Sequence, residues 1–300
     1  MINKCWLAGP TTIITDIRRY DDVKIIASLS ARFVPFFFNT RYRLARMTRK
    51  HRHFGNLVRR WFFDGDEMIV LPKDNVVTID TDIEIDDAGE RTILPSDVVK
   101  ALIDRADEIF IMDFCLCRKS NKCEDYPLDR GCIFLGKGTK KIPEKFGHSA
   151  TKEEAKQYID ECGELGLVHI IGRNKLDSMW LHTGDKKDLM TICNCCPCCC
   201  LWNMVRDISD DIASSYRRMD GVEVNVDADR CIGCGSCADI CFTKAIEIVD
   251  GKSVLNDKCR GCGRCADICP NDAISITFDK EMAGPEIERL EKLVNLSTGD

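Results

Sequence analysis

Residues 229–241 read DRCIGCGSCADIC, and residues 257–270 repeat the pattern as DKCRGCGRCADICP. In each copy, two residues separate the first cysteine from the second and the second from the third, and three residues separate the third from the fourth. Three thiolates at this spacing can hold three corners of an iron–sulfur cubane, while the fourth cysteine binds the other cluster of a pair. The glycines between them let backbone N–H groups approach the sulfides. The repeat therefore predicts two interleaved clusters, an arrangement that two zinc ribbons would not need.

This double motif resembles that of bacterial-type ferredoxins with two [4Fe-4S] clusters, over about residues 222–278. The resemblance implies two ligand sets: Cys231, Cys234, Cys237 and Cys269 for the first cluster, and Cys259, Cys262, Cys265 and Cys241 for the second. One position departs from the family pattern, because Phe242 follows Cys241 where proline is usual. We expect the cluster that Cys241 ligates to be intact but altered in reduction potential.

Ten further cysteines lie upstream in two dense groups. They are Cys115, Cys117, Cys123 and Cys132, followed by Cys193, Cys195, Cys196, Cys198, Cys199 and Cys200. Hydrophobic packing does not explain six cysteines in eight positions, because adjacent side chains point in different directions and only some of them could enter a core. We expect the two groups to build one upstream site or region, although spacing alone does not separate iron–sulfur clusters from zinc. Two cubanes would use eight of the ten thiols, which leaves two for another role.

The order of the upstream motifs carries a second resemblance. Cys-x-Cys-Arg at 115–118, Cys-Asn-Cys-Cys-x-Cys-Cys-Cys at 193–200 and a following ferredoxin motif resemble a group of 4Fe-4S-binding proteins of anaerobic bacteria and archaea. The resemblance implies cluster binding and electron transfer, and it names no substrate. The isolated Cys5 and Cys162 are expected to be core residues.

Hydrophobic patterning predicts an α+β fold, with a Cys-rich cluster-binding domain followed by a two-cluster ferredoxin-like domain. We expect strands at 68–72, 76–85, 109–112, 167–171 and 178–181, and helices at 97–106, 152–165, 201–219 and after Pro285. The strand at 109–112 leads directly to Cys115. Thr151 and Glu154 form a capping box for the helix that follows them.

These elements suggest four regions. They are a basic and aromatic N-terminal region (1–63), a Cys-rich α+β domain with the upstream metal sites (64–220), the ferredoxin domain (221–279), and a C-terminal helix and tail (280–300).

Composition limits the classes of function. The chain has 300 residues, 20 cysteines and a net charge of −6, and it contains no apolar run near the roughly 18 residues of a membrane span. Clustered cysteines without a secretory pattern favour a reduced cytoplasmic setting in an anaerobe rather than a disulfide scaffold. The acidic balance argues against binding to nucleic acid.

The segment from Arg41 to Arg60 is rich in basic residues, in contrast to the negative net charge of the chain. We call this segment the basic block. It is either a solvated helix face or a docking surface, for an acidic redox partner or for an anionic membrane at its inner face. No residue is assigned a catalytic role, and His148, His169 and His182 are weak candidates for ligands or proton carriers.

We therefore expect an electron-transfer protein, a carrier or redox subunit rather than a stand-alone enzyme. It would pass single low-potential electrons to or from a partner protein, using two ferredoxin clusters and one or two more iron–sulfur clusters upstream. Two alternatives stay open: a reductase or cofactor-binding enzyme with its active cluster in 115–200, and a zinc-binding interaction module fused to a ferredoxin.

Overall fold

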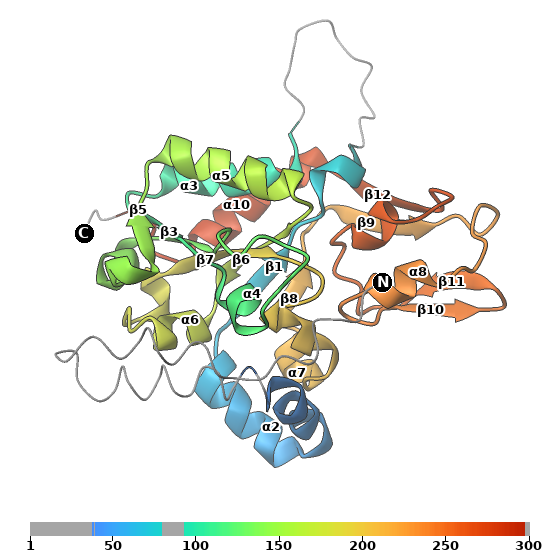
Figure 1. Cartoon of the computed structure of the whole chain (residues 1–300), viewed down its shortest axis with the longest axis horizontal. Coiled ribbons are helices and arrows are strands. Elements are labelled where there is room, and N and C mark those ends of the chain that lie inside the picture. Colours follow the sequence, from blue (N-terminus) through green and yellow to red (C-terminus); the bar gives the residue numbers. More distant parts are fainter. Residues whose placement is uncertain (1–37, 39, 80–92, 298–300) are drawn as a thin grey trace, which may run out of the picture.

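A seven-stranded sheet forms the centre of the molecule (Figure 1). The structure is a computed structural model, and it describes residues 38, 40–79 and 93–297. The strand order is β5 (Gly147–Ser149), β3 (Ile109–Met112), β4 (Ile133–Leu135), β7 (Met190–Cys195), β6 (Val168–Arg173), β1 (Glu67–Val70) and β8 (Tyr216–Arg218). Neighbouring strands are antiparallel, except that β1 and β8 are parallel. The mixture of helices and sheets confirms the α+β prediction.

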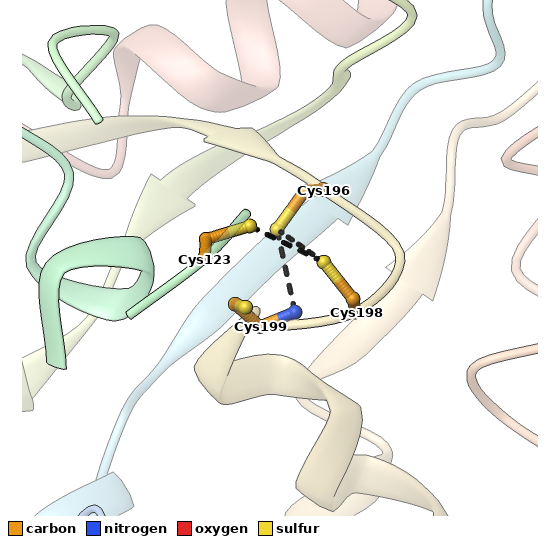
Figure 2. Close-up of side chains that lie close together, drawn as sticks. All are labelled: Cys123, Cys196, Cys198 and Cys199. Atoms are coloured by element: carbon orange, nitrogen blue, oxygen red, sulfur yellow. Dashed lines mark hydrogen bonds between the residues drawn. The ribbon is translucent and has the colours of Figure 1, made fainter. Parts of the chain in front are cut away.

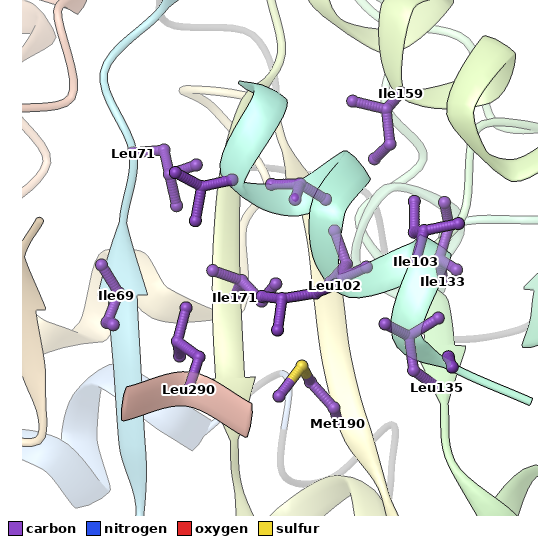
Figure 3. Close-up of a cluster of buried hydrophobic side chains, with 14 of the residues drawn as sticks. Ile69, Leu71, Leu102, Ile103, Ile133, Leu135, Ile159, Ile171, Met190 and Leu290 are labelled. Carbon is purple, nitrogen blue, oxygen red and sulfur yellow. The ribbon is translucent and has the colours of Figure 1, made fainter. Parts of the chain in front are cut away.

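Three helices cover one face of this sheet (Figure 3). They are α3 (Pro95–Arg105), α5 (Lys152–Glu164) and α10 (Ala283–Glu291). Leu102, Ile159 and Leu290 from these helices are completely buried against Ile69 and Ile171 of the sheet. Burial of these side chains is the main source of stability here, since each contributes about 2 kcal/mol by leaving water.

The opposite face of the sheet carries the upstream cysteines. Successive side chains of a strand point to opposite faces. In β7, Ile192 therefore faces the helices, whereas Cys193 and Cys195 face a second core that contains Met68 and Val70. The same alternation that builds the helix-covered core delivers the thiols to the other side.

This second face is covered by short elements. They are a helix over 40–50, α2 (Arg52–Val58), a π-helical turn (Arg59–Phe63), α4 (Leu116–Ser120), α6 (Lys175–Trp180), a 3-10 helix (Leu201–Arg206) and α7 (Asp210–Ala213). The remaining 3-10 turns are Asp74–Val76, Lys137–Lys141, Glu144–Phe146, Lys186–Asp188 and Lys280–Met282.

The ferredoxin-like region has a three-stranded sheet in the order β2 (Val77–Ile79), β12 (Ile274–Phe278) and β9 (Val222–Val226). A hairpin of β10 (Ile246–Val249) and β11 (Lys252–Leu255) and the short helices α8 (Ser236–Ile240) and α9 (Arg264–Asp267) complete it. Strand β2 belongs to the upstream part of the chain and pairs in parallel with β12. Ile276 and Phe278 enter the core beneath α3, so a hydrophobic core continues across the predicted boundary at 220/221, which stays a prediction.

Two of the predicted elements are wrong. The long helix at 201–219 is instead a 3-10 helix, α7 and β8, because tertiary partners replace helical hydrogen bonds. The amide of Ser209 donates to Thr48 Oγ1 (3.0 Å), and the carbonyl of Ser215 accepts from the amide of Met68 (2.8 Å). The strand at 178–181 is part of α6, which begins where the side chain of Asn174 accepts a hydrogen bond from the amide of Asp177 (2.8 Å).

The other expected elements are present. Helix α5 is capped by Thr151 Oγ1, which accepts from the amide of Glu154 at 3.1 Å. Helix α3 begins at Pro95, two residues earlier than expected, with Leu94 as its N-cap. Strand β2 covers 77–79; residues 80–85 of the predicted strand, residues 1–37 and Cys5 lie outside the described residues. Among the described residues, no helix is both long and apolar enough to cross a membrane.

Candidate metal centres

The structure brings the eight ferredoxin cysteines together in two sets around two hollows. The first cluster set, Cys231, Cys234, Cys237 and Cys269, lines a hollow of about 330 Å³. The second cluster set, Cys241, Cys259, Cys262 and Cys265, lines one of about 350 Å³. Both volumes include space open to solvent, and these are the sets that the interleaved motif implies.

Local backbone geometry explains how each set forms. Gly235 and Gly263 are the N-caps of α8 and α9, with φ of 82° and 84° in the left-handed region. Glycine adopts this conformation without steric cost, so the chain can turn back after the second cysteine of each motif. The close agreement of the two angles shows that the sequence repeat is also a structural repeat.

Hydrogen-bond donors point at these thiols. Backbone amides of Ala245 and Ala273 donate to the sulfurs of Cys241 and Cys269, each at 3.3 Å. The Cys231 sulfur lies in hydrogen-bond contact with the hydroxyl (3.5 Å) and the amide (3.4 Å) of Ser253, and both contacts lower the pKa of its thiol. Donation to sulfur favours the thiolate and the reduced state of a bound cluster. The donor chemistry of both sets therefore fits [4Fe-4S] clusters.

The ten upstream cysteines separate into two groups. The four-thiol group contains Cys123, Cys196, Cys198 and Cys199, whose sulfurs all lie within 4.8 Å of one another (Figure 2). The other six interact with one another and form the six-thiol group: Cys115, Cys117, Cys132, Cys193, Cys195 and Cys200. In the six-thiol group, the sulfurs of Cys132 and Cys193 are 3.8 Å apart and those of Cys195 and Cys200 are 3.0 Å apart.

Strand register builds the six-thiol group. Ile133 of β4 lies opposite Ile192 of β7, so the preceding Cys132 lies beside Cys193. Cys115, three residues after the end of β3, is the N-cap of α4, and its amide donates to the carbonyl of Leu128 at 2.7 Å. A hydrogen bond from Cys117 lowers the pKa of Cys115 to about 7, so this thiol ionises near neutral pH.

Arg118 supplies positive charge between the two groups. Its side chain is fully buried, donates to the carbonyl of Asn194 at 3.0 Å and also donates to the carbonyl of Arg130. Burial alone would lower its pKa, but the neighbouring thiols of Cys115 and Cys196 raise it. Arg118 therefore stays protonated and offsets thiolate charge. Hydrogen bonds from Cys198 and Cys199 lower the pKa of Cys196 well below that of an ordinary thiol, which favours its thiolate.

The histidines have other partners. Buried His169 shares a hydrogen bond of 2.8 Å with Asn194, and burial lowers its pKa, so the ring is neutral. Asn194 in turn donates to the carbonyl of Gly131 at 2.9 Å, which steadies the backbone next to Cys132. His148 lies on the surface between Asp113 (2.8 Å) and Glu154 (3.1 Å). Burial raises the pKa of Cys162 to about 12, so it is a neutral core thiol.

Two residues join the second cluster set to the six-thiol group: Arg264, which no sequence motif assigned, and Phe242, which was noted only as a departure from the usual proline. Arg264, which follows Gly263, is 6% exposed and donates to the carbonyl of Cys195 at 2.8 Å. Its guanidinium lies 5.6 Å from the ring centre of Phe242, which is buried in the core that contains Cys195. A difference between the repeats is the signal that could have found Arg264, which stands where the first repeat has Ser236. The same kind of difference marked Phe242, which stands where the second repeat has Pro270.

Comparisons with known proteins agree with the downstream geometry. Residues 224–276 match a family described as a 4Fe-4S dicluster domain. Ferredoxin-2 of Desulfomicrobium norvegicum is 50% identical to this chain over 34 residues, which are 11% of this chain and 58% of that relative. No solved structure matches the chain. Residues 224–276 are thus a ferredoxin-type 4Fe-4S domain within a longer chain.

Proposed function

We propose that this protein transfers single electrons between the two ferredoxin clusters and at least one iron–sulfur cluster held by the six-thiol group. The observation that carries the proposal is the buried hydrogen bond from Arg264 to the carbonyl of Cys195 (2.8 Å). Arg264 lies between Gly263 and Cys265 of the second cluster set, and Cys195 belongs to the six-thiol group. One side chain thus spans the distance between two candidate redox centres.

The two ferredoxin cluster sets differ in their exposure to solvent, and this difference supports a direction for electron transfer through the protein. Cys234 of the first cluster set is exposed, and the neighbouring Ile232 is 64% exposed. Cys262 of the second cluster set packs against the core that contains Cys195 and Cys200. The first cluster is therefore the exchange point with an outside donor, and the second cluster is the relay to the six-thiol group.

When bound, the clusters supply one-electron redox chemistry. The chain's own residues orient and tune them. Phe242 excludes water between the second cluster set and the six-thiol group. The local dielectric constant is therefore lower, and electrostatic interactions between nearby charges are stronger. Arg264 and Arg118 offset the negative charge that thiolates and an added electron bring to this region.

The basic block offers a docking surface for an acidic redox partner. Its exposed cations are Arg43, Arg46, Arg49, Lys50, Arg52, Arg59 and Arg60. Apolar side chains lie among them, with Trp61 60% and Leu57 50% exposed. Opposite charge steers such partners together and makes association sensitive to salt. Arg41 of the same segment donates to Asn121 Oδ1 (3.1 Å), and Asn121 donates to the carbonyl of Cys117 (2.7 Å), so this surface is connected to the six-thiol group.

One observation favours a second candidate function. The six-thiol group has two more thiols than a single cubane needs. A reductase could use the surplus to bind a substrate or a further cofactor beside the cluster. A spectral shift of an upstream cluster when a small ligand is added would support this function, whereas full ligation of every upstream iron by cysteine would contradict it.

Iron and acid-labile sulfide analysis of the full chain, purified without oxygen, tests the proposal. Two ferredoxin clusters and one upstream [4Fe-4S] cluster require about twelve iron atoms and about twelve sulfides per chain. A measured count of about eight irons and eight sulfides would fit the two ferredoxin clusters alone and would contradict the upstream cluster. Fewer than about eight would contradict the ferredoxin clusters as well.

A further inference from the structure

We propose that the four-thiol group binds one metal ion in a tetrahedral site, separate from every iron–sulfur cluster of the protein. The sulfur of Cys198 lies 3.5 Å from that of Cys123 and 3.7 Å from that of Cys196. Figure 2 shows Cys123 meeting the three cysteines of the loop that follows β7, with all four sulfurs turned toward a common centre.

The spacing of the sulfurs decides the number of metal atoms. A single ion bound to four sulfurs at about 2.3 Å places neighbouring sulfurs about 3.8 Å apart, from tetrahedral geometry. In a cubane each thiolate binds a different iron, so the whole iron–sulfide core separates the four sulfurs and spreads them further apart. All four sulfurs of the four-thiol group lie within 4.8 Å of one another, which matches one ion. In the six-thiol group the close contacts join pairs, Cys132 with Cys193 and Cys195 with Cys200.

The ferredoxin-type domain provides an internal comparison. Its two sets surround hollows of about 330 and 350 Å³. Across residues 38, 40–79 and 93–297, the sulfurs of the four-thiol group all lie within 4.8 Å of one another, whereas those of neither ferredoxin set do. The protein thus contains two kinds of cysteine site. In one kind the cysteines surround a space large enough for a cluster, and in the other the sulfurs are close enough to bind a single ion.

The loop that carries three of the four thiols is held in this shape by its own hydrogen bonds. The amide of Cys199 donates to the sulfur of Cys196 at 3.3 Å. Asn203 donates to the carbonyl of Pro197 at 2.8 Å, and Asn121 donates to the carbonyl of Cys199 at 3.3 Å. These contacts hold the loop in a shape that presents its three sulfurs beside that of Cys123, and four protein ligands are what a closed structural site has.

Tetrahedral sites with four thiolates take zinc or iron, and both share this coordination chemistry. Zinc would make the site structural, holding Cys123 to the Cys196–Cys199 loop. A single iron would add a redox-active ion. The inference does not depend on the proposed electron transfer, because a single ion brings no sulfide and needs no reduction.

X-ray absorption at the zinc and iron edges of the full chain, purified without oxygen, tests the site directly. We expect one ion per chain, zinc or a non-cluster iron, with four sulfur neighbours at about 2.3 Å and no metal neighbour. Zinc content separates the two metals, and Mössbauer spectra identify a mononuclear iron. Absence of any such ion from the native protein would overturn the proposal.

Variants extend the test. Cys198→Ser and Cys199→Ser should each lose the single ion while iron bound in clusters and sulfide stay unchanged. Cys162→Ala is the matched control, because Cys162 is buried in the same core yet is not one of the four ligands. Loss of about four irons and four sulfides from Cys198→Ser would show a cubane instead. The metal analysis of the native protein can contradict the proposal by itself, so the test still holds if a variant fails to fold.

Discussion

The guanidinium of Arg264 donates a hydrogen bond to the backbone carbonyl of Cys195, with 2.8 Å between nitrogen and oxygen. Arg264 follows the N-cap of α9, and Cys195 is the last residue of β7. The contact therefore joins the ferredoxin-type domain to the cysteine run through one buried side chain. A hydrogen bond with a charged donor is among the stronger single contacts in a protein interior.

Replacement of Arg264 by serine tests this contact. Arg264→Ser converts the position to the residue that the first repeat has at Ser236. It leaves the Cys195 carbonyl without its donor, so we expect the free energy of unfolding to fall by about 2 kcal/mol. Electron transfer from the ferredoxin clusters to the upstream cluster should become slower. Denaturant unfolding without oxygen and stopped-flow spectroscopy measure the two effects.

Ser236→Ala is the control for that experiment, because it changes the equivalent position of the first repeat. Cluster content should be unchanged in both variants. An Arg264→Ser protein with wild-type stability and wild-type electron-transfer rate would show that the contact has neither role.

Phe242→Pro restores the usual ferredoxin residue and removes a buried ring. Phe242 is 6% exposed and packs in the core with Trp202 and Cys195. Loss of a buried phenylalanine costs about 3 kcal/mol, so the melting temperature should fall while the eight ferredoxin irons stay bound. Pro270→Ala, at the exposed equivalent position, should have little effect. A stable Phe242→Pro protein would contradict the packing role.

Asp66 should make stability depend on pH. Burial raises its pKa to about 7 from an ordinary value of 3.8, and its Oδ2 has no hydrogen-bond partner. Between these values the folded protein holds a proton that the unfolded chain has released. Stability therefore falls as pH rises toward 7 and then levels off.

Asp66→Asn removes this dependence. Between pH 5.5 and 6.5, the wild type should lose about 1 kcal/mol more stability than the variant, as expected for one proton. The amide oxygen of the asparagine can still accept from the amide of Lys175, which donates to Asp66 at 2.8 Å. Asp64→Asn makes the same change of charge at an exposed position. Parallel stability curves for wild type and Asp66→Asn would contradict the prediction.

The C-terminal helix should be essential to the shared core. Leu290 of α10 is completely buried against α3, and Glu286 of the same helix binds Arg217 at 2.8 Å. Leu290→Ala should lower the free energy of unfolding by about 3 kcal/mol, whereas exposed Glu288→Ala should not. Equal stability of the two variants, measured by denaturant unfolding, would show that α10 is dispensable.

Sequence alone predicted what depends on local pattern. The spacing of Cys231 to Cys269 names two sets that the structure brings together, and the capping box at Thr151 predicted the start of α5. The continuous apolar run at 109–112 also predicted a buried strand, and all four of its residues are buried in β3. These features are written within a few neighbouring residues.

Features that depend on register or on distant partners could not be predicted. The Cys193–Cys200 run is divided into two groups by the end of β7 and by the pairing of β4 with β7. Neither the strand end nor the pairing can be predicted from the local sequence. The helical spacing of Leu201 to Met219 correctly indicated burial. It gave the wrong conformation because Ser209 and Ser215 bond to Thr48 and Met68, which are remote in sequence.

Freeze-quench EPR spectroscopy of the anaerobic full chain tests the central claim most directly. The protein is mixed with less than one equivalent of a one-electron donor, and the signals of the ferredoxin and upstream clusters are followed in time. We predict that a ferredoxin signal appears first and decays as an upstream signal grows, because the exposed set at Cys234 receives the electron and Arg264 lies on the path inward. An upstream signal that grows before any ferredoxin signal, or that never appears, would contradict the account.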